Sequence, residues 1–274
     1  MTLTMNDAEL MTAYRNLSQV ELEREMYVAK SKAMVERARM DLSLQELRLL
    51  QYVLSKVKPD DTIDTEYTIS IKRFLQVCGL EVRSGESYNA VKRQIDSLWS
   101  HRFWMMDESG REVGVQWITK PVLDRAAGTV SVRLDPDVQD WVIGLIGRDR
   151  YIQYKLLAIL PMRSVYSVKL YELLKAQYNK REVTFPLEDL RGMLCSGSGK
   201  YPNFKDFRRR VLDTAKTEIN AYSDLFVAYE PVYTGHRVTA VRYTIRHRSV
   251  NDKIMLENQN NELLNAGYTL ADFL

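Results

Sequence analysis

The sequence predicts an α+β fold made of two tandem winged-helix domains, each a helix-turn-helix followed by a β-hairpin wing, related by pseudo-symmetry. Two observations lead to this prediction. A short strand that runs directly into an amphipathic helix occurs at Thr68–Leu75 and again, 116 residues later, at Thr184–Arg191. Each copy is followed by a second amphipathic helix, a strand, a polar turn and another strand. We therefore divide the chain into an N-terminal arm (1–37), a first winged-helix domain (38–148), a second winged-helix domain (149–248) and an acidic C-terminal tail (249–274).

Length and composition are consistent with this division. A chain of 274 residues, 45% of them hydrophobic, can form two cores of about 100 residues each. No apolar run approaches the roughly 18 residues that span a membrane, and no basic segment leads an apolar block as in a secretion signal. The two cysteines, Cys78 and Cys195, are too few for a disulfide framework, so we expect buried thiols and a cytoplasmic protein.

One strong helix is expected before the first copy, at residues 42–57. Ser43 and Glu46 have the spacing of a capping box, an apolar stripe follows, and Pro59 lies beyond its end. The remaining elements of the first domain are a strand at 67–71, a short helix at 72–78, a second helix at 87–100 capped by Ser87, hairpin strands at 102–106 and 113–118, and a third strand at 130–134.

The second copy follows the same order after a connection. Residues 138–161 are expected to link the halves with further helix, which Pro161 ends. The elements expected after it are a helix at 165–178, a strand at 183–185, a helix at 187–194, a long helix at 203–221, and wing strands at 225–229 and 237–246.

The long helix at 203–221 carries the clearest functional signal. At about 100° per residue, one face is apolar and packs on its own domain; its residues are Phe204, Phe207, Val211, Ala215 and Ile219. From Lys200 to Lys216 there are six basic and two acidic residues, and from Tyr233 to Arg248 four arginines and no acid. Arginine suits both guanine edges in the major groove and phosphate groups, so we expect double-stranded DNA as the partner. The candidate DNA-binding residues of this domain are Lys205, Arg208, Arg209, Arg210, Lys216, Asn220, and, on the wing, Arg237 and Arg242.

The first domain is less basic, and its role is left open. Lys92 and Arg93 on its second helix are candidates for contact with the DNA backbone, but a protein-interaction surface or a purely structural role explains the domain equally well. The strand with Val130, Val132 and Leu134 is expected to expose an edge that suits self-association by sheet pairing.

Signals for catalysis are weak. Gly197–Lys200 resembles half of a phosphate-binding loop, but Leu194 stands where the first glycine is required and Tyr201 where serine or threonine is required. The three histidines, at positions 101, 236 and 247, have no metal-ligand spacing. We therefore expect no enzymatic activity, no metal and no cofactor.

Three segments resemble one known family, the iteron-binding replication initiator (Rep) proteins of theta-type plasmids. Tyr166–Leu174 is similar to a helix of that family, apart from Lys169, where an arginine is common. Phe204–Leu212, continued by Glu218 to Asn220, resembles its recognition helix, and Gly235–Ile245 its last hairpin. The similarity runs from about residue 38 to residue 248 and excludes both ends of the chain.

The resemblance implies a bacterial, non-catalytic DNA-binding protein. It implies that a monomer binds the direct repeats of a plasmid origin, with the second domain reading bases and the first mainly holding backbone. It further implies a homodimer, formed through the first domain in equilibrium with the monomer, that binds an operator inverted repeat and represses the protein's own gene. The host initiator, the replicative helicase and chaperones are the implied protein partners. A duplicated winged-helix repressor without an initiator role, and a scaffold that uses winged helices for protein contacts, remain alternatives.

Overall fold

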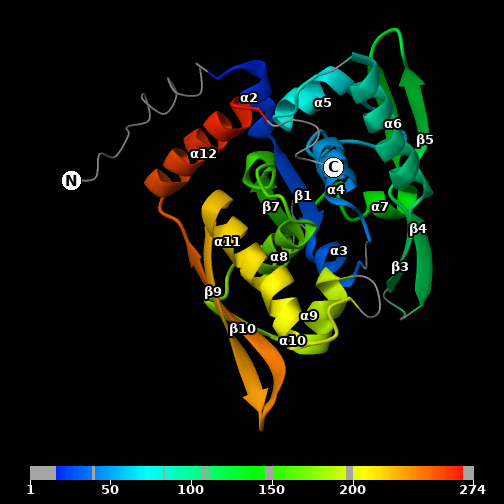
Figure 1. Cartoon of the computed structure of the whole chain (residues 1–274). Helices are drawn as coiled ribbons and strands as arrows, with labels where there is room; N and C mark the ends of the chain where they lie inside the picture. The colour runs from blue at the N-terminus through cyan, green and yellow to red at the C-terminus, as the bar shows by residue number, and fades with distance from the viewer. Residues whose placement is uncertain are drawn as a thin grey trace.

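The computed structural model describes residues 17–38, 41–82, 84–106, 109, 111–145, 151–195 and 200–267 (Figure 1). The first copy is confirmed as a helix-turn-helix with strands behind it. Its elements are α4 (Leu44–Leu54), β2 (Tyr67–Ser70), α5 (Ile71–Val77), α6 (Ser84–Ser100), β3 (Arg102–Met106), β4 (Glu112–Gln116), β5 (Ile118–Asp124) and β6 (Thr129–Leu134). β3 pairs with β4 in one sheet, and the second sheet has the order β2-β6-β5.

The second copy repeats this arrangement with a longer second helix and a longer wing. Its elements are α8 (Val165–Lys175), β8 (Glu182–Pro186), α9 (Leu187–Leu194), α10 (Phe204–Phe207), the π-helical segment η2 (Arg208–Leu212), α11 (Asp213–Tyr222), β9 (Leu225–Thr234) and β10 (Arg237–His247). The sheet has the order β8-β10-β9, all antiparallel. In Figure 1 the β9–β10 hairpin projects from the body of the protein as an extended wing.

Local sequence signals place several helix ends correctly. At the start of α4, the backbone N–H of Ser43 donates to Glu46 Oε2 over 2.6 Å, and the N–H of Glu46 donates to Ser43 Oγ over 3.3 Å, which confirms the capping box. The predicted cap at Ser87 is wrong. Because α6 begins at Ser84, Ser87 lies within its first turn and is buried.

The predicted helical connection at 138–161 is also wrong over most of its length. The described part forms a short helix α7 (Pro136–Gln139), a strand β7 (Tyr151–Lys155) and a 3-10 turn η1 (Leu156–Ala158). In β7 burial alternates, with Ile152 and Tyr154 inside and Tyr151 and Gln153 exposed. The strand exists because it pairs with β1 (Tyr27–Ser31), a segment more than 100 positions earlier in the chain.

Much of the predicted N-terminal arm belongs to the folded protein. α2 (Gln19–Arg24), β1 and α3 (Lys32–Arg37) lie in the region assigned to the arm, yet Val28 and Met34 belong to the hydrophobic core. Residues 1–16 of the predicted arm lie outside the described residues.

The C-terminal tail forms one helix, α12 (Val250–Asn265), that packs back on the first copy beside α2 (Figure 1). The buried guanidinium of Arg24 donates to Asn261 Oδ1 over 3.2 Å, to Asn265 Oδ1 over 2.8 Å and to the Val77 carbonyl over 2.9 Å. Gly79, with φ +71°, lies so close to α12 that a Cβ there would meet the Leu264 carbonyl oxygen at 2.7 Å. α2 and α12, which lie near the two ends of the described chain, thus meet at the end of α5.

A buried ion pair joins the elements between the two copies. Lys30 Nζ on β1 lies 2.6 Å from Glu172 Oε1 on α8, and both side chains are almost fully buried. The same oxygen accepts hydrogen bonds from Gln51 Nε2 on α4, over 3.1 Å, and from the Tyr154 hydroxyl on β7. Side chains from β1, α4 and β7 therefore all contact the one Glu172 carboxylate of α8.

The prediction of an exposed strand edge at Val130, Val132 and Leu134 is wrong. β6 is the central strand of its sheet, paired with β2 on one side and β5 on the other, and these three side chains are at most 1% exposed. The alternation that suggested a strand marks its core-facing side. The edges of this sheet are β2 and β5, so the three residues cannot form a surface for self-association.

No helix within the described ranges is long and apolar enough to cross a membrane.

Candidate nucleic-acid interface

The predicted reading helix is one continuous helix made of α10, η2 and α11. Asn203 caps its start, because the Asn203 side-chain oxygen accepts from the Asp206 backbone N–H over 2.8 Å. The helix packs on its own domain through the face that the sequence predicted. Phe207, Val211, Ala215 and Ile219 are fully buried, and Phe204 is partly buried.

A π turn in the middle of this helix was not predicted. The N–H of Asp213 donates to the carbonyl of Arg208, five residues earlier, where an α-helix bonds four residues back. The wider turn reduces the rotation per residue locally. Leu212, which was not among the residues of the predicted apolar face, is fully buried.

The basic residues of the helix form an exposed face opposite the core. Arg208 and Arg209 have 55% and 66% of their side-chain surface exposed. The other members, Lys205, Arg210 and Lys216, are also exposed. We call these five residues the cationic face. Their exposure agrees with the prediction from the sequence, whereas their contact with DNA stays a prediction.

Two arginines of the cationic face already have acidic neighbours. Arg208 Nε lies 3.8 Å from Asp213 Oδ2, and Arg209 Nη2 lies 3.4 Å from Asp206 Oδ1. Exposed pairs of this kind contribute about 0–1 kcal/mol, so a phosphate or a guanine edge can displace them. No partner within the described residues pairs with Arg210.

Asp213 connects the helix to the wing. Its Oδ1 accepts a hydrogen bond from the Tyr229 hydroxyl on β9 over 2.5 Å, while Oδ2 faces Arg208. Burial and this hydrogen bond raise the pKa of Tyr229, so the phenol remains a donor at neutral pH. Asp213 therefore lies between Arg208 and the Tyr229 hydroxyl of the wing.

Asn220 was predicted to contact DNA, and the structure gives its side chain another role. The side-chain amide donates to the Val227 carbonyl over 2.9 Å and accepts from the Val227 N–H over 2.6 Å. Both polar ends of the amide are used to hold β9 against α11. The helical angle alone placed Asn220 on the outer face, but the wing covers the end of the helix.

The wing presents a second basic surface. Val241, Tyr243 and Ile245 are buried on one face of β10, as predicted, while Arg242 and Arg246 are exposed on the other. Arg242 Nη1 lies 3.1 Å from Glu230 Oε1 on the neighbouring strand.

The tip of the wing is a tight turn. Arg237 begins β10 and is exposed, two residues after Gly235, whose φ of +61° is the left-handed conformation that suits glycine. The two candidate wing arginines therefore lie at the tip and midway along the same hairpin.

The first copy presents a smaller basic surface. Lys92 and Arg93 lie on α6, which occupies the place that α10 to α11 have in the second copy. Both side chains are exposed, and no described residue forms an ion pair with either.

These surfaces have the chemistry of binding. Within the described ranges, no three or more histidine, cysteine, aspartate or glutamate side chains are grouped so that they could hold a metal ion. The cationic face and the wing present exposed guanidinium and ammonium groups, which can donate hydrogen bonds to the phosphates and base edges of a duplex. Residues 196–199, with the glycines that resemble half of a phosphate-binding loop, lie outside the described residues.

Comparison with known proteins gives two matches to family models. The model described as "Initiator Replication protein, WH1" matches residues 27–175, and the model described as "Initiator Rep protein, WH2" matches residues 186–245. The first match begins at β1 and ends at the last residue of α8, so it includes the β1–β7 sheet.

Solved structures with similar folds include the Pi initiator protein, crystallised in complex with iteron DNA. That match has a TM-score of 0.68 and 17% sequence identity, and it covers 82% of this chain and 99% of the Pi chain. A weaker match is the WH1 domain of a replication protein isolated from a multiple sclerosis patient. It has 19% identity and a TM-score of 0.26, and it covers 51% of this chain and 87% of that chain. A further match, with domains 2 and 3 of RctB, has 14% identity, a TM-score of 0.40 and coverage of 84% of this chain and 83% of that chain.

Proposed function

The chain belongs to the initiator replication (Rep) protein family, and we propose that it initiates plasmid replication by binding direct repeats at the origin as a monomer. The observation that carries this proposal is the exposed cationic face on α10 to α11, backed by its buried apolar face and followed by a basic wing. The similar fold of the Pi initiator, which was crystallised with iteron DNA, supports the same mode of binding.

In this mode the second copy reads bases and the first copy holds the backbone. We assign Arg208, Arg209 and Arg210 to base edges and nearby phosphates, and Lys205 and Lys216 to phosphates. Arg237 and Arg242 extend the contact along the wing. Lys92 and Arg93 hold the neighbouring backbone through the first copy, which lengthens the bound site.

We further propose that a dimer represses the protein's own gene at an inverted repeat. The support for this step is the family to which the chain belongs. With β6 buried, the dimer surface must lie elsewhere on the first copy. Sedimentation of the purified protein between about 0.1 and 100 µM would reveal a monomer–dimer equilibrium, and a single species over that range would contradict it.

A plasmid assay tests the initiator role. The gene and its flanking DNA are placed on a selectable circle that cannot otherwise replicate. We expect colonies with the wild-type gene and none with a variant in which Arg208, Arg209 and Arg210 are all alanine. Lys58→Ala, a change at an exposed lysine remote in sequence from the second copy, is the control and should support colonies.

A reporter fused to the gene's own promoter separates the initiator from a repressor without initiator role. Repression of the reporter without any replicating circle, in the bacterial host from which the DNA comes, would favour the repressor. Replication that persists in the triple arginine variant would contradict the assignment of the cationic face.

A further inference from the structure

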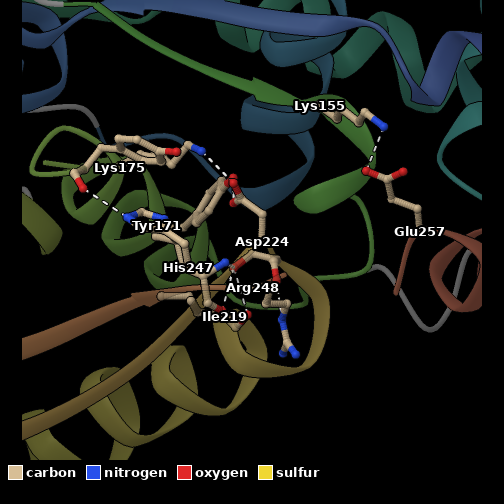
Figure 2. A network of polar contacts seen from close by, with 11 residues as sticks. Lys155, Tyr171, Lys175, Ile219, Asp224, His247, Arg248 and Glu257 are labelled. Atoms are coloured by element: carbon tan, nitrogen blue, oxygen red, sulfur yellow. Dashed lines mark hydrogen bonds and ion pairs between the residues drawn. The ribbon is translucent and has the colours of Figure 1, made fainter. Parts of the chain in front are cut away.

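The C-terminal end of the reading helix (α10 to α11) is held by residues that follow the wing. Arg248 Nε donates to the Ser223 carbonyl over 3.0 Å, and its Nη2 donates to the Asn220 carbonyl (Figure 2). Asn260 Nδ2, on α12, donates to the Tyr222 carbonyl over 2.8 Å. The last carbonyls of a helix have no partner within it, and a cation near them also complements the helix dipole. Arg248 and Asn260 therefore attach the end of α11 to the segment that leads into and forms α12.

A residue just past that end is joined to α8. The Tyr171 hydroxyl donates to Asp224 Oδ1 over 2.7 Å, and Lys175 Nζ lies 2.6 Å from Asp224 Oδ2 (Figure 2). Burial alone would raise the pKa of Asp224, but the Lys175 ammonium, the two hydrogen bonds and Lys253 on α12 lower it below its usual value. The carboxylate thus stays charged at neutral pH, where it holds the end of α11 to α8 and attracts Lys253.

The other end of α12 lies on the first copy. Asn261 and Asn265 accept hydrogen bonds from the buried guanidinium of Arg24 on α2. The Asn265 side chain also donates to Glu21 Oε1 on α2 over 3.0 Å. One helix therefore runs from the end of the reading helix to α2 and α5 of the other half of the protein.

Contacts along its length hold α12 against the body of the protein. Lys155 Nζ of β7 lies 2.7 Å from Glu257 Oε1 of α12 (Figure 2), and Leu256 and Leu264 are buried. The 16 residues of α12 make a rod about 24 Å long. A helix anchored at both ends and in the middle is a rigid connection between the two copies.

A rigid connection has a consequence for DNA binding. When both copies contact one duplex, the distance between α6 and the reading helix has to match the spacing of the two contacted DNA segments. Two base pairs inserted between those segments move them apart by about 7 Å and rotate them by about 70° about the duplex axis. When two linked binding modules cannot engage together, the affinity gained from linking them is lost.

We propose that α12 is a brace that sets the separation of the two DNA-binding helices, and thereby the spacing that the protein accepts between the DNA segments contacted by each copy. Arg248 and Asn260 are positioning residues at the end of the reading helix, and Asn261 and Asn265 position the brace on the first copy. The inference rests on the proposed function, because it requires both copies on one duplex. The brace acts on specificity through geometry and needs no DNA contact of its own.

A series of duplexes with different spacing tests the proposal on the full-length protein. The motif selected from a random library is mapped by methylation interference, and base pairs are inserted between the two contacted segments. We expect the affinity of wild type to fall about tenfold or more when two base pairs are inserted. Arg248→Gln and Asn261→Ala/Asn265→Ala, the brace variants, should bind the original duplex more weakly and lose only about threefold or less on the same insertion.

Two controls separate bracing from DNA contact and from stability. Asn258→Ala/Gln259→Ala, which changes two exposed amides on the same helix, should keep the wild-type dependence on spacing. Arg209→Ala should weaken binding to every duplex of the series by the same factor. Thermal melting identifies the temperatures at which each variant is folded, and Asn260→Ala replaces Arg248→Gln if the latter does not fold.

The results that overturn the proposal are specific. They are folded brace variants that keep the wild-type dependence on spacing, or a control pair that loses this dependence equally. A wild type that accepts the inserted base pairs, or that contacts only one DNA segment, would overturn it as well. A wild type that selects no duplex at all would contradict the proposed function itself, and with it this proposal.

Discussion

Three adjacent arginines on one helix do not have equivalent positions. Arg208 lies near Asp213, which also contacts Tyr229 of the wing. Arg209 is more exposed than Arg208, and Arg210 has no ion-pair partner among the described residues. Consecutive residues are separated by about 100° on an α-helix and by less in a π turn, so the three cannot reach the same base. The geometry favours Arg209 for base edges and its neighbours for phosphates.

The first prediction concerns two residues of the cationic face. Arg209→Ala should cost roughly 1–3 kcal/mol of DNA-binding free energy and relax specificity at one base pair. Lys216→Ala should weaken all duplexes alike and reduce the slope of log K against log salt by about 1. Titrations of a selected duplex and of single-base variants, at several salt concentrations, measure both. The assignment fails if Arg209→Ala leaves the ranking of the duplexes unchanged.

The second prediction concerns Lys169, a buried lysine on α8. Burial lowers the pKa of Lys169 to about 8, below the value of roughly 10.4 in an unfolded chain. Between those two pH values the unfolded lysine binds more protons than the folded one, so the contribution of Lys169 to folding stability rises with pH through this window. Urea unfolding of wild type and of Lys169→Met at pH 7, 8, 9 and 10 separates this contribution from that of the other titrating groups. The free energy of unfolding of wild type, relative to that of Lys169→Met, should increase over the same range. A difference that stays constant with pH would contradict the prediction.

Helices and strands differ in how far the sequence reveals them. The pattern of apolar residues predicted α9 at its observed bounds, and the long helix and β10 to within one residue at each end. It also predicted the start of β9, but β9 continues to Thr234, five residues past the predicted end. These elements carry their own signals: a periodic apolar face, caps, and glycine at the turn. The same periodicity predicted the exposed positions of Lys205, Arg209 and Lys216, whereas it placed Arg208 closer to the apolar side than the structure does.

Most of the missed features depend on contacts that no local pattern encodes. β1 and β7 form only because each completes the other, and no local signal distinguished β7 from a helix. Asn220 lies on the outer face by helical angle, but its side chain bonds to β9, and the π turn rests on a single hydrogen bond from Asp213 to Arg208. Neither the π turn nor the contact between Asn220 and the wing produces a periodic pattern in the sequence. The predicted DNA-binding residues therefore included Asn220, whose side chain holds β9 against the helix.

The third prediction concerns Leu212. Leu212→Ala should lower the free energy of unfolding by about 2–5 kcal/mol, as expected for a fully buried leucine. Lys216→Ala, at an exposed position of the same helix, is the control and should change it by well under about 1 kcal/mol. Chemical denaturation of both variants measures the difference, and equal stability of the two variants would contradict the buried position of Leu212.

The two winged helices are joined by polar contacts as well as by one core. The buried Lys30–Glu172 pair lies where β1, α4, β7 and α8 meet, and Arg24 ties α2 and α5 to the end of α12. The segments before and after the duplicated units, predicted to be an arm and a tail, therefore help to fix how the two units sit together (Figure 1).

The fourth prediction tests this arrangement at Lys30. Lys30→Met should destabilise the protein by about 3–5 kcal/mol, because it leaves the Glu172 carboxylate buried without its cation. The double variant Lys30→Met/Glu172→Gln, which removes both charges but keeps an acceptor for Gln51 and Tyr154, should recover much of that loss. Urea unfolding of the two single variants and the double variant gives the coupling free energy. Additive losses would mean that the pair does not act as a unit.

The central claim is that the cationic face of α10 to α11 lies in the major groove of a specific duplex. The most direct measurement is selection of duplexes from a random library with the full-length protein, followed by methylation interference at guanine N7 on the enriched motif. We predict a defined motif with guanines whose methylation blocks binding, and loss of enrichment when Arg208, Arg209 and Arg210 are all replaced by alanine. Enrichment of the same motif by that triple variant would contradict the account.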